Sequence, residues 1–118
     1  MIFGVSEDYM IYLASPYSHP RAAVRSERAR NAVLAAAWLI RERGEAVFSP
    51  IAHSHHIALV GALDTTWETW AEMDLAIISV CRELVVLQLA GWEQSKGVAA
   101  EVAEAERLGI PVTYRSAE

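Results

Sequence analysis

Short apolar runs alternate along the chain with longer stretches in which apolar residues recur every three or four positions. The short runs are rich in Val, Leu, Ile and Tyr and are bounded by turn residues, which is typical of buried strands. They cover residues 9–15, 45–50, 83–90 and 110–115. The longer stretches predict helices over residues 20–43, 65–80 and 95–109.

The residues at the ends of these stretches fit the preferences of helix termini. Pro20 stands at the start of the first predicted helix and Gly44 just past its end, which is the usual asymmetry. Thr65 and Glu68 have the spacing of a capping box for the second helix. Ser95 is a natural N-cap for the third.

The alternation of strands and helices predicts an α/β fold. We expect a three-layer sandwich with a parallel sheet of four or five strands, flavodoxin-like or Rossmann-like. No repeat, low-complexity tract or linker interrupts residues 1–118, so a single domain is expected. Ligands of such sheets bind beyond the carboxyl ends of the strands. That rule places three polar segments on one rim as loops, namely residues 15–19, 49–56 and 91–97.

Composition and charge narrow the classes of function. Hydrophobic residues make up 53% of the chain and charged residues 21%, as in a globular protein. The net charge of −5 argues against binding a nucleic-acid polymer, although backbone N–H groups can still bind a small anion. The single cysteine, Cys81, excludes an internal disulfide and is compatible with a reducing compartment. Because no membrane span or targeting segment is evident, we expect a cytoplasmic protein without a membrane partner.

Two carboxylates fall on helix faces that are otherwise apolar. Glu101 lies within the apolar face of the third predicted helix, and Asp74 within that of the second. The neighbours of Glu101 on its face are Val98, Val102, Ala105, Leu108 and Gly109, and those of Asp74 are Leu63, Trp67, Trp70, Met73, Ile77, Ile78 and Cys81. A carboxylate without partners costs several kcal/mol in an apolar interior, so this placement indicates either a partner or a function.

Both explanations of the two acids stay open at this level. Each acid can pair with an arginine at the edge of the core, for which Arg25, Arg28 and Arg82 are candidates. Alternatively, desolvation raises one carboxyl pKa enough for that acid to donate a proton near neutral pH while the other stays ionised. The presence of two such acids, one of them beside the rim, favours a functional pair.

The segment that leads into the third helix offers a modest site for an anion or a hydroxyl group. The Ser95 hydroxyl and the N–H groups of the first helical turn, which contains Gly97, can bind there. The segment matches neither GxxxxGK[ST] nor GxGxxG. ATP hydrolysis and a dinucleotide are therefore not indicated, and no cofactor is expected.

Three histidines, His53, His55 and His56, lie close together in the second rim segment. Together with Asp64 or His19 they allow a metal site, but their spacing is too dense for a helical HExxH pair. Hydrogen bonds from His53 and His55 to a ligand are favoured over a metal, and an ordinary surface loop is the third alternative.

The tryptophans Trp67, Trp70 and Trp92 are core residues in the simplest interpretation. Because Trp92 lies in a rim segment, it is the tryptophan best placed to form the wall of a pocket against a planar ring.

Three stretches of the sequence resemble the nucleoside 2-deoxyribosyltransferase-like superfamily. They are IYLASPYS, WAEMDLAIISVCRELVVLQL and SKGVAAEVAEAERLGIPV. The chain is most similar to an uncharacterised bacterial or phage branch related to the deoxynucleoside 5'-monophosphate N-glycosidases. The resemblance implies that Glu101 is the nucleophile, that Asp74 protonates the departing base and that Tyr12 positions the nucleophile. Ser95 stands where those N-glycosidases have a serine that contacts the 5'-phosphate.

The residues and the resemblance together predict the function. We expect an N-glycosidase or glycosyltransferase that cleaves a nucleoside or nucleoside 5'-monophosphate through a covalent glycosyl ester on Glu101. The residues expected to bind the substrate are Ser15, Tyr17, Ser18, His53, His55, Trp92, Ser95 and Gly97. The resemblance also implies a homo-oligomer, a dimer or higher. The alternatives are a non-catalytic nucleotide-binding module and a metal-dependent enzyme built on residues 53–56.

Overall fold

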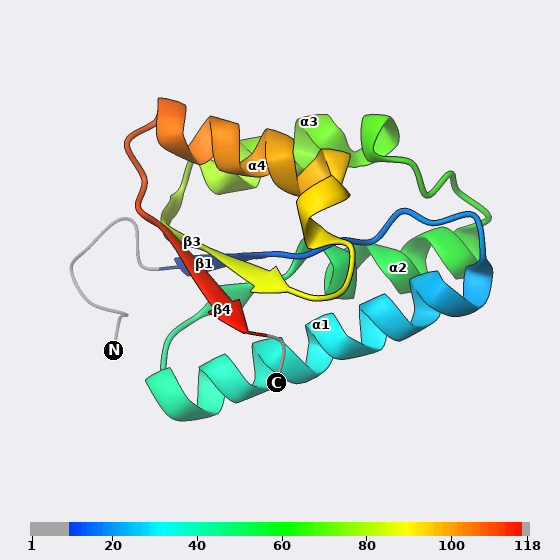
Figure 1. Cartoon of the computed structure of the whole chain (residues 1–118), viewed down its shortest axis with the longest axis horizontal. Coiled ribbons are helices and arrows are strands. Elements are labelled where there is room, and N and C mark those ends of the chain that lie inside the picture. The colour runs from blue at the N-terminus through cyan, green and yellow to red at the C-terminus, as the bar shows by residue number, and fades with distance from the viewer. Residues whose placement is uncertain (1–9, 117–118) are drawn as a thin grey trace.

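Parallel strands and the helices that connect them make up the structure, a computed structural model that describes residues 10–116 (Figure 1). The strands are β1 (Met10–Ala14), β2 (Val47–Phe48), β3 (Cys81–Gln88) and β4 (Val112–Ser116). The helices are α1 (Ala22–Arg43), α2 (Pro50–Gly61), α3 (Trp67–Ile78) and α4 (Lys96–Arg107), and a 3-10 turn, η1 (Trp92–Gln94), precedes α4.

The four strands of the described sheet are parallel and lie in the order β2-β1-β3-β4. The chain passes from β1 outward to β2 and then returns to place β3 on the other side of β1. The switch in direction therefore lies between β1 and β3, where Tyr12 is opposite Leu84 and Ala14 opposite Val86. In sheets of this kind the crevice that binds a ligand lies at the carboxyl ends of the two strands at the switch.

Helices cover both faces of the sheet, so the predicted three-layer α/β sandwich is confirmed. In Figure 1, α3 and α4 lie above the sheet and α1 and α2 below it. Because successive side chains of a strand point to opposite faces, each central strand serves two cores. On β1, Tyr12 and Ala14 pack in the core under α3 and α4, whereas Ile11 and Leu13 pack in the core over α1.

The predicted C-terminus of the first helix and the predicted N-cap of the third agree with the structure, whereas α1 begins at Ala22, two residues after the predicted start at Pro20. Gly44 follows α1 in the left-handed conformation, with φ of 63°, and its N–H donates to the Ile40 carbonyl at 3.0 Å. Ser95 is the N-cap of α4, and its hydroxyl oxygen accepts from the Val98 N–H at 3.1 Å.

Helix α2 was not predicted, and it corrects the interpretation of residues 49–56 as a loop. Ser49 is its N-cap and accepts from the Ala52 N–H at 3.0 Å, while Pro50 occupies the first helical position. The histidines at 53, 55 and 56 therefore project from a helix in different directions. Because His55 alone of the three lines the cavity described below, the helix separates their roles.

The predicted capping box at the start of α3 is wrong. The N-cap is Thr66, which makes no side-chain cap hydrogen bond, and its own N–H donates to Asp64 Oδ1 at 2.9 Å. Glu68 instead pairs with Lys96 at the start of α4, at 2.5 Å. Glu68 thus forms an ion pair between α3 and α4 instead of the predicted cap of α3.

Three residues predicted on apolar faces are exposed, namely Leu63, Leu108 and Gly109. Leu63 follows the end of α2 and is 50% exposed, and Leu108 follows the last turn of α4 and is 38% exposed. The helical count was carried past the real ends of the helices at these positions. No helix within residues 10–116 is long and apolar enough to cross a membrane.

Candidate active site

A cavity of about 420 Å³ opens at the carboxyl ends of the strands, beside the switch between β1 and β3. Its lining comes from the segment after β1, from all four helices α1–α4, and from the segments that lead into α3 and α4. Both Asp74 and Glu101 line this cavity. The fold thus brings together two acids that lie on separate helices.

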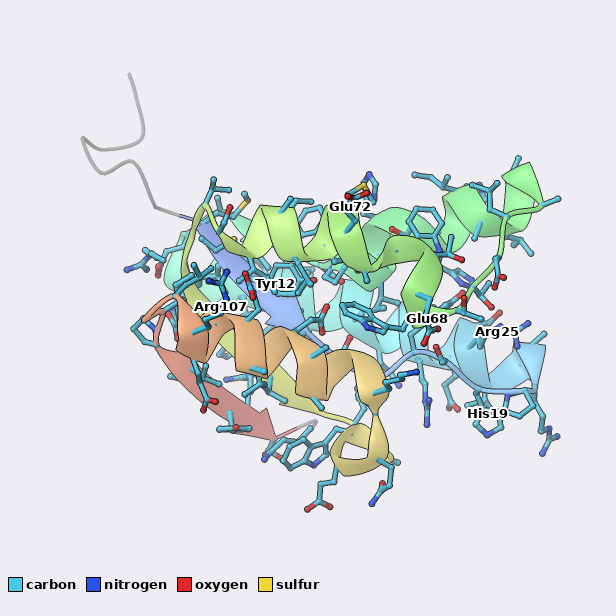
Figure 2. The ribbon with its side chains drawn as sticks, turned by 90° about the horizontal axis from the view of Figure 1, so that it is seen from above. Tyr12, His19, Arg25, Glu68, Glu72 and Arg107 are labelled. Carbon is cyan, nitrogen blue, oxygen red and sulfur yellow. The ribbon has the colours of Figure 1, made fainter. Side chains whose placement is uncertain are left out.

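Tyr12 on the central strand β1 forms a hydrogen bond with the Glu101 carboxyl group. The Tyr12 hydroxyl donates to Glu101 Oε2 at 2.5 Å, which is a short hydrogen bond. Tyr12 is fully buried and Glu101 is 3% exposed. Figure 2 shows Tyr12 on β1, between α3 and α4. The bond therefore ties the carboxyl group on α4 to the rigid centre of the sheet.

Asp74 is buried without a compensating contact. Its side chain is 4% exposed, and its Oδ1 atom has no hydrogen-bond partner among residues 10–116. A buried carboxyl oxygen that is left unpaired is costly, and native proteins keep such groups mainly at functional sites. Asp74 therefore lines the cavity and carries a buried oxygen that no described residue satisfies.

Burial shifts the pKa values of both acids upward. Desolvation raises the pKa of Asp74 to about 6. It raises the pKa of Glu101 to about 8, with a further rise from the charge of Asp74 and an opposing effect of the hydrogen bond from Tyr12. Burial and the nearby acids also raise the pKa of Tyr12, so its hydroxyl stays protonated. Near neutral pH the two carboxyl groups together hold about one proton.

None of the arginines considered as partners neutralises either acid. Arg25 donates to the His19 carbonyl, Arg82 pairs with Glu45, and Arg28 donates to two backbone carbonyls. Within the described part of the chain, the explanation of the two acids as core-edge ion pairs is therefore not supported.

Two serines lie where the resemblance leads us to expect substrate contacts. Ser15 is 5% exposed, lines the cavity, and has a hydroxyl oxygen without a partner among the described residues. Ser95 also lines the cavity, next to Gly97 and the first turn of α4. Ser15 and the start of α4 thus line the same cavity.

Arg28 joins the two loops of the rim. Its guanidinium donates to the Ser18 carbonyl at 2.9 Å and to the Ala90 carbonyl at 3.2 Å. Gly91, the residue after Ala90, has φ of 91°, and a Cβ there would lie 2.6 Å from Arg28 Nη2. Sequence reasoning considered Arg28 only as a partner for the acids, because its backbone contacts depend on tertiary structure.

Tyr17 and His55 meet across the cavity lining. The Tyr17 hydroxyl and His55 Nδ1 are 2.7 Å apart, and both residues line the cavity. His53 does not line it, and its ring lies against Phe48 and Ser54 instead. Among residues 10–116 no group of three or more His, Cys, Asp or Glu side chains is arranged to hold a metal ion.

The aromatic wall of the cavity differs from the prediction. Trp92 does not line the cavity and packs against Tyr114, with ring centroids 5.6 Å apart. Trp67 and Trp70 at the start of α3 line it instead. A Cβ on Gly97 would lie 3.2 Å from Trp67, so the bare glycine lets α4 approach the indole closely. The signal in the sequence was the shared helix face of Trp67, Trp70 and Asp74.

A solved structure of known activity shares this fold. It is the 2-deoxyribosyltransferase from the psychrotolerant bacterium Bacillus psychrosaccharolyticus, described as a biocatalyst for the synthesis of antiviral and antitumoral nucleosides. The alignment has 26% sequence identity and a TM-score of 0.62, and it covers 91% of this chain and 72% of the other. The four-stranded parallel sheet with its helices is thus the flavodoxin-like fold of a 2-deoxyribosyltransferase.

Comparison with functionally curated proteins yields no match. The sequence pattern of one family, described as a domain of unknown function (DUF1937), matches residues 9–117. That match spans nearly the whole chain, and the protein therefore belongs to the DUF1937 family.

Proposed function

We propose that this protein cleaves the N-glycosidic bond of a nucleoside or nucleoside 5'-monophosphate, with Glu101 as nucleophile and Asp74 as proton donor. The observation that carries the proposal is the pair of buried acids on one cavity, of which one is hydrogen-bonded by Tyr12 and the other has a free oxygen. The likeness to a 2-deoxyribosyltransferase supports glycosyl transfer as the class of reaction.

In the first step a carboxylate oxygen of Glu101 forms a bond to the anomeric carbon of the sugar. The bond between that carbon and the base nitrogen breaks, and its electron pair leaves with the base. The Asp74 carboxyl group gives its proton to the base, which then departs neutral. In the second step water or another base attacks the anomeric carbon, the ester bond breaks, and the Glu101 carboxylate is regenerated.

This chemistry requires one proton on the pair, with Asp74 protonated and Glu101 ionised. Of the two acids Glu101 has the higher pKa, so before the substrate binds the proton lies mainly on the nucleophile. A bound sugar that develops positive charge at its anomeric carbon stabilises the ionised Glu101, and the hydrogen bond from Tyr12 does the same. Binding of the substrate would thus transfer the proton to Asp74.

Three features favour a 5'-monophosphate over a free nucleoside. Ser95 and the N–H groups at the start of α4 form an anion-binding geometry. The Ser15 hydroxyl lies on the same cavity without a partner in the described chain. Arg28 lines the cavity and makes no ion pair with a carboxylate of the described residues.

A homo-oligomer, a single-domain protein and a cytoplasmic location remain predictions.

Release of free base, followed by chromatography, tests the proposal. The panel contains ribo- and deoxyribonucleosides and their 5'-monophosphates. The wild type should release base from at least one of them, and Glu101→Gln should reduce that rate by at least about a thousandfold, as expected for a lost nucleophile. The matched control is Glu106→Gln, because Glu106 is exposed on the same helix and does not line the cavity.

The outcomes separate the proposal from its alternatives. Equal base release by the wild type and Glu101→Gln would contradict the assigned nucleophile. Binding of a nucleotide without base release, even after long incubation, would favour the non-catalytic binding module.

A further inference from the structure

The contact between Tyr17 and His55 is not needed for the cleavage steps above, although both residues line the same cavity. The hydroxyl oxygen and Nδ1 are 2.7 Å apart, and the two rings meet edge to face with centroids 5.5 Å apart. Tyr17 comes from the segment after β1, and His55 from the second turn of α2. The pair therefore fixes the position of an imidazole on a wall that carries neither of the two acids.

The direction of this hydrogen bond follows from the neighbours of the pair. Arg25 on α1 lies against Tyr17, and its guanidinium can only donate hydrogen bonds. Its charge and hydrogen bonding act to lower the pKa of Tyr17, but burial has the larger effect and raises it, so the phenol keeps its proton. Because Arg25 donates to the Tyr17 hydroxyl oxygen, the hydroxyl group can donate its own proton to His55 Nδ1.

The state of the imidazole agrees with that direction. Burial, His56 and Arg25 hold the pKa of His55 below its usual range, so the ring is neutral at pH 7. A neutral imidazole that accepts at Nδ1 carries its proton on Nε2. The two hydrogen bonds therefore have the same direction: Arg25 donates to Tyr17, and Tyr17 donates to His55.

We propose that Tyr17 and His55 form a fixed, neutral donor that recognises the substrate by a hydrogen-bond acceptor, through the Nε2–H group of His55. The acceptor is an oxygen or unprotonated ring nitrogen of the base, or an oxygen of the 5'-phosphate. The class of ligand rests on the proposed function, whereas the protonation pattern of the pair does not. His55 is a specificity residue here, and Tyr17 is its positioning residue.

The first test reads the protonation pattern without any ligand. Long-range proton–nitrogen NMR spectra of the full-length protein, with His55→Gln to assign the signals, report which nitrogen carries the proton. In the wild type we expect His55 to be protonated on Nε2 alone, and in Tyr17→Phe we expect a fraction protonated on Nδ1 to appear. A wild-type His55 protonated mainly on Nδ1 would overturn the proposal, whatever the activity of the protein.

The second test measures recognition. His55→Phe removes the donor and should raise KM for the best substrate about three- to tenfold, the effect of one lost neutral hydrogen bond, with little change in kcat. His55→Gln keeps an amide donor and should recover part of the loss. His53→Gln is the matched control, because His53 is exposed on the same helix and does not line the cavity.

The nucleoside and nucleotide arms identify the acceptor. A loss in KM of equal size for a nucleoside and its 5'-monophosphate assigns the acceptor to the base, and a loss confined to monophosphates assigns it to the phosphate. Unchanged KM values for His55→Phe across the panel would overturn the proposal. If no panel member is cleaved, the same comparison is made with dissociation constants from NMR titration, and unchanged or absent binding would overturn it as well.

Discussion

The Glu101 carboxyl group is buried among apolar side chains and receives one short hydrogen bond from Tyr12. A group selected for stability alone would be apolar at this position, since burial opposes its ionisation. Asp74 repeats the situation with still fewer contacts, because one of its oxygens has no partner among the described residues. At the scale of single residues, the site is thus a pair of acids whose ionisation the fold resists.

The pair predicts a bell-shaped pH dependence of kcat/KM. Activity needs one proton on the two acids, and the pKa values of about 6 for Asp74 and about 8 for Glu101 bound the range in which that state dominates. We expect an acid limb near pH 6, an alkaline limb near pH 8 and a maximum between them, measured as base release. Asp74→Asn should be slow and should lose the alkaline decline, and a flat profile for the wild type would contradict the shared proton.

Burial of Glu101 also predicts a gain in stability when the charge is removed. Its folded-state pKa of about 8 lies above the ordinary value of 4.5, so the folded protein binds this proton more tightly than the unfolded chain. The wild type therefore loses stability as the pH rises from about 4.5 to about 8, and Glu101→Gln escapes that loss. We expect the variant's advantage in the free energy of unfolding to grow by about 2–4 kcal/mol between pH 5 and pH 8.

Urea unfolding at several pH values measures this difference. Glu106→Gln is the control, because the exposed Glu106 side chain should leave the pH dependence as it is in the wild type. A constant difference between Glu101→Gln and the wild type at all pH values would contradict the burial argument.

At the scale of the elements, the site depends on how the loops at the strand ends are held. Arg28 on α1 binds the backbone of the loops after β1 and β3, and Gly91 gives it room. The start of α4 approaches Trp67 of α3 at Gly97. The Arg28 contacts hold the two loops of the rim together, and the close approach at Gly97 brings α4 against α3.

Gly91→Ala should therefore weaken substrate binding, which the same substitution at Gly44 should not do. The new Cβ would sit 2.6 Å from Arg28 Nη2 and would hold a residue at φ of 91°. Gly44→Ala is the matched control, because Gly44 also has a positive φ, of 63°, but has no atom within 4 Å of its Cβ position. We expect about 1–3 kcal/mol of backbone strain in both, measured by thermal unfolding. Loss of substrate affinity should follow only in Gly91→Ala, and equal affinities would contradict the role of Arg28.

The sequence predicted the elements to different degrees. The strands, the C-terminus of α1 and the start of α4 were predictable because their signals are local: apolar runs, a glycine after α1 and a serine before α4. The sequence does not distinguish α2 from a loop, because Pro50 fits the end of the preceding strand as well as the start of a helix. The capping box failed because Glu68 has a stronger partner, Lys96, on another helix.

At the scale of the whole molecule, the order of the strands brings the site together. The switch between β1 and β3 places the ends of both strands, and the starts of the helices that follow them, around one cavity. Helical periodicity predicted that Asp74 and Glu101 face inward, and the structure buries both on that cavity. The contacts of Arg28 and the exclusion of Trp92 and His53 from the lining could not be predicted, because they depend on how separate elements pack.

The proposed covalent ester on Glu101 can be detected by mass spectrometry. The protein is mixed with its best substrate, quenched in acid within the first turnovers, and its intact mass and peptides are determined by mass spectrometry. We expect a mass increase of one sugar or sugar phosphate, located on the peptide that carries Glu101 and absent in Glu101→Gln. Rapid base release in the first turnover with no added mass, or with the adduct on another residue, would contradict it.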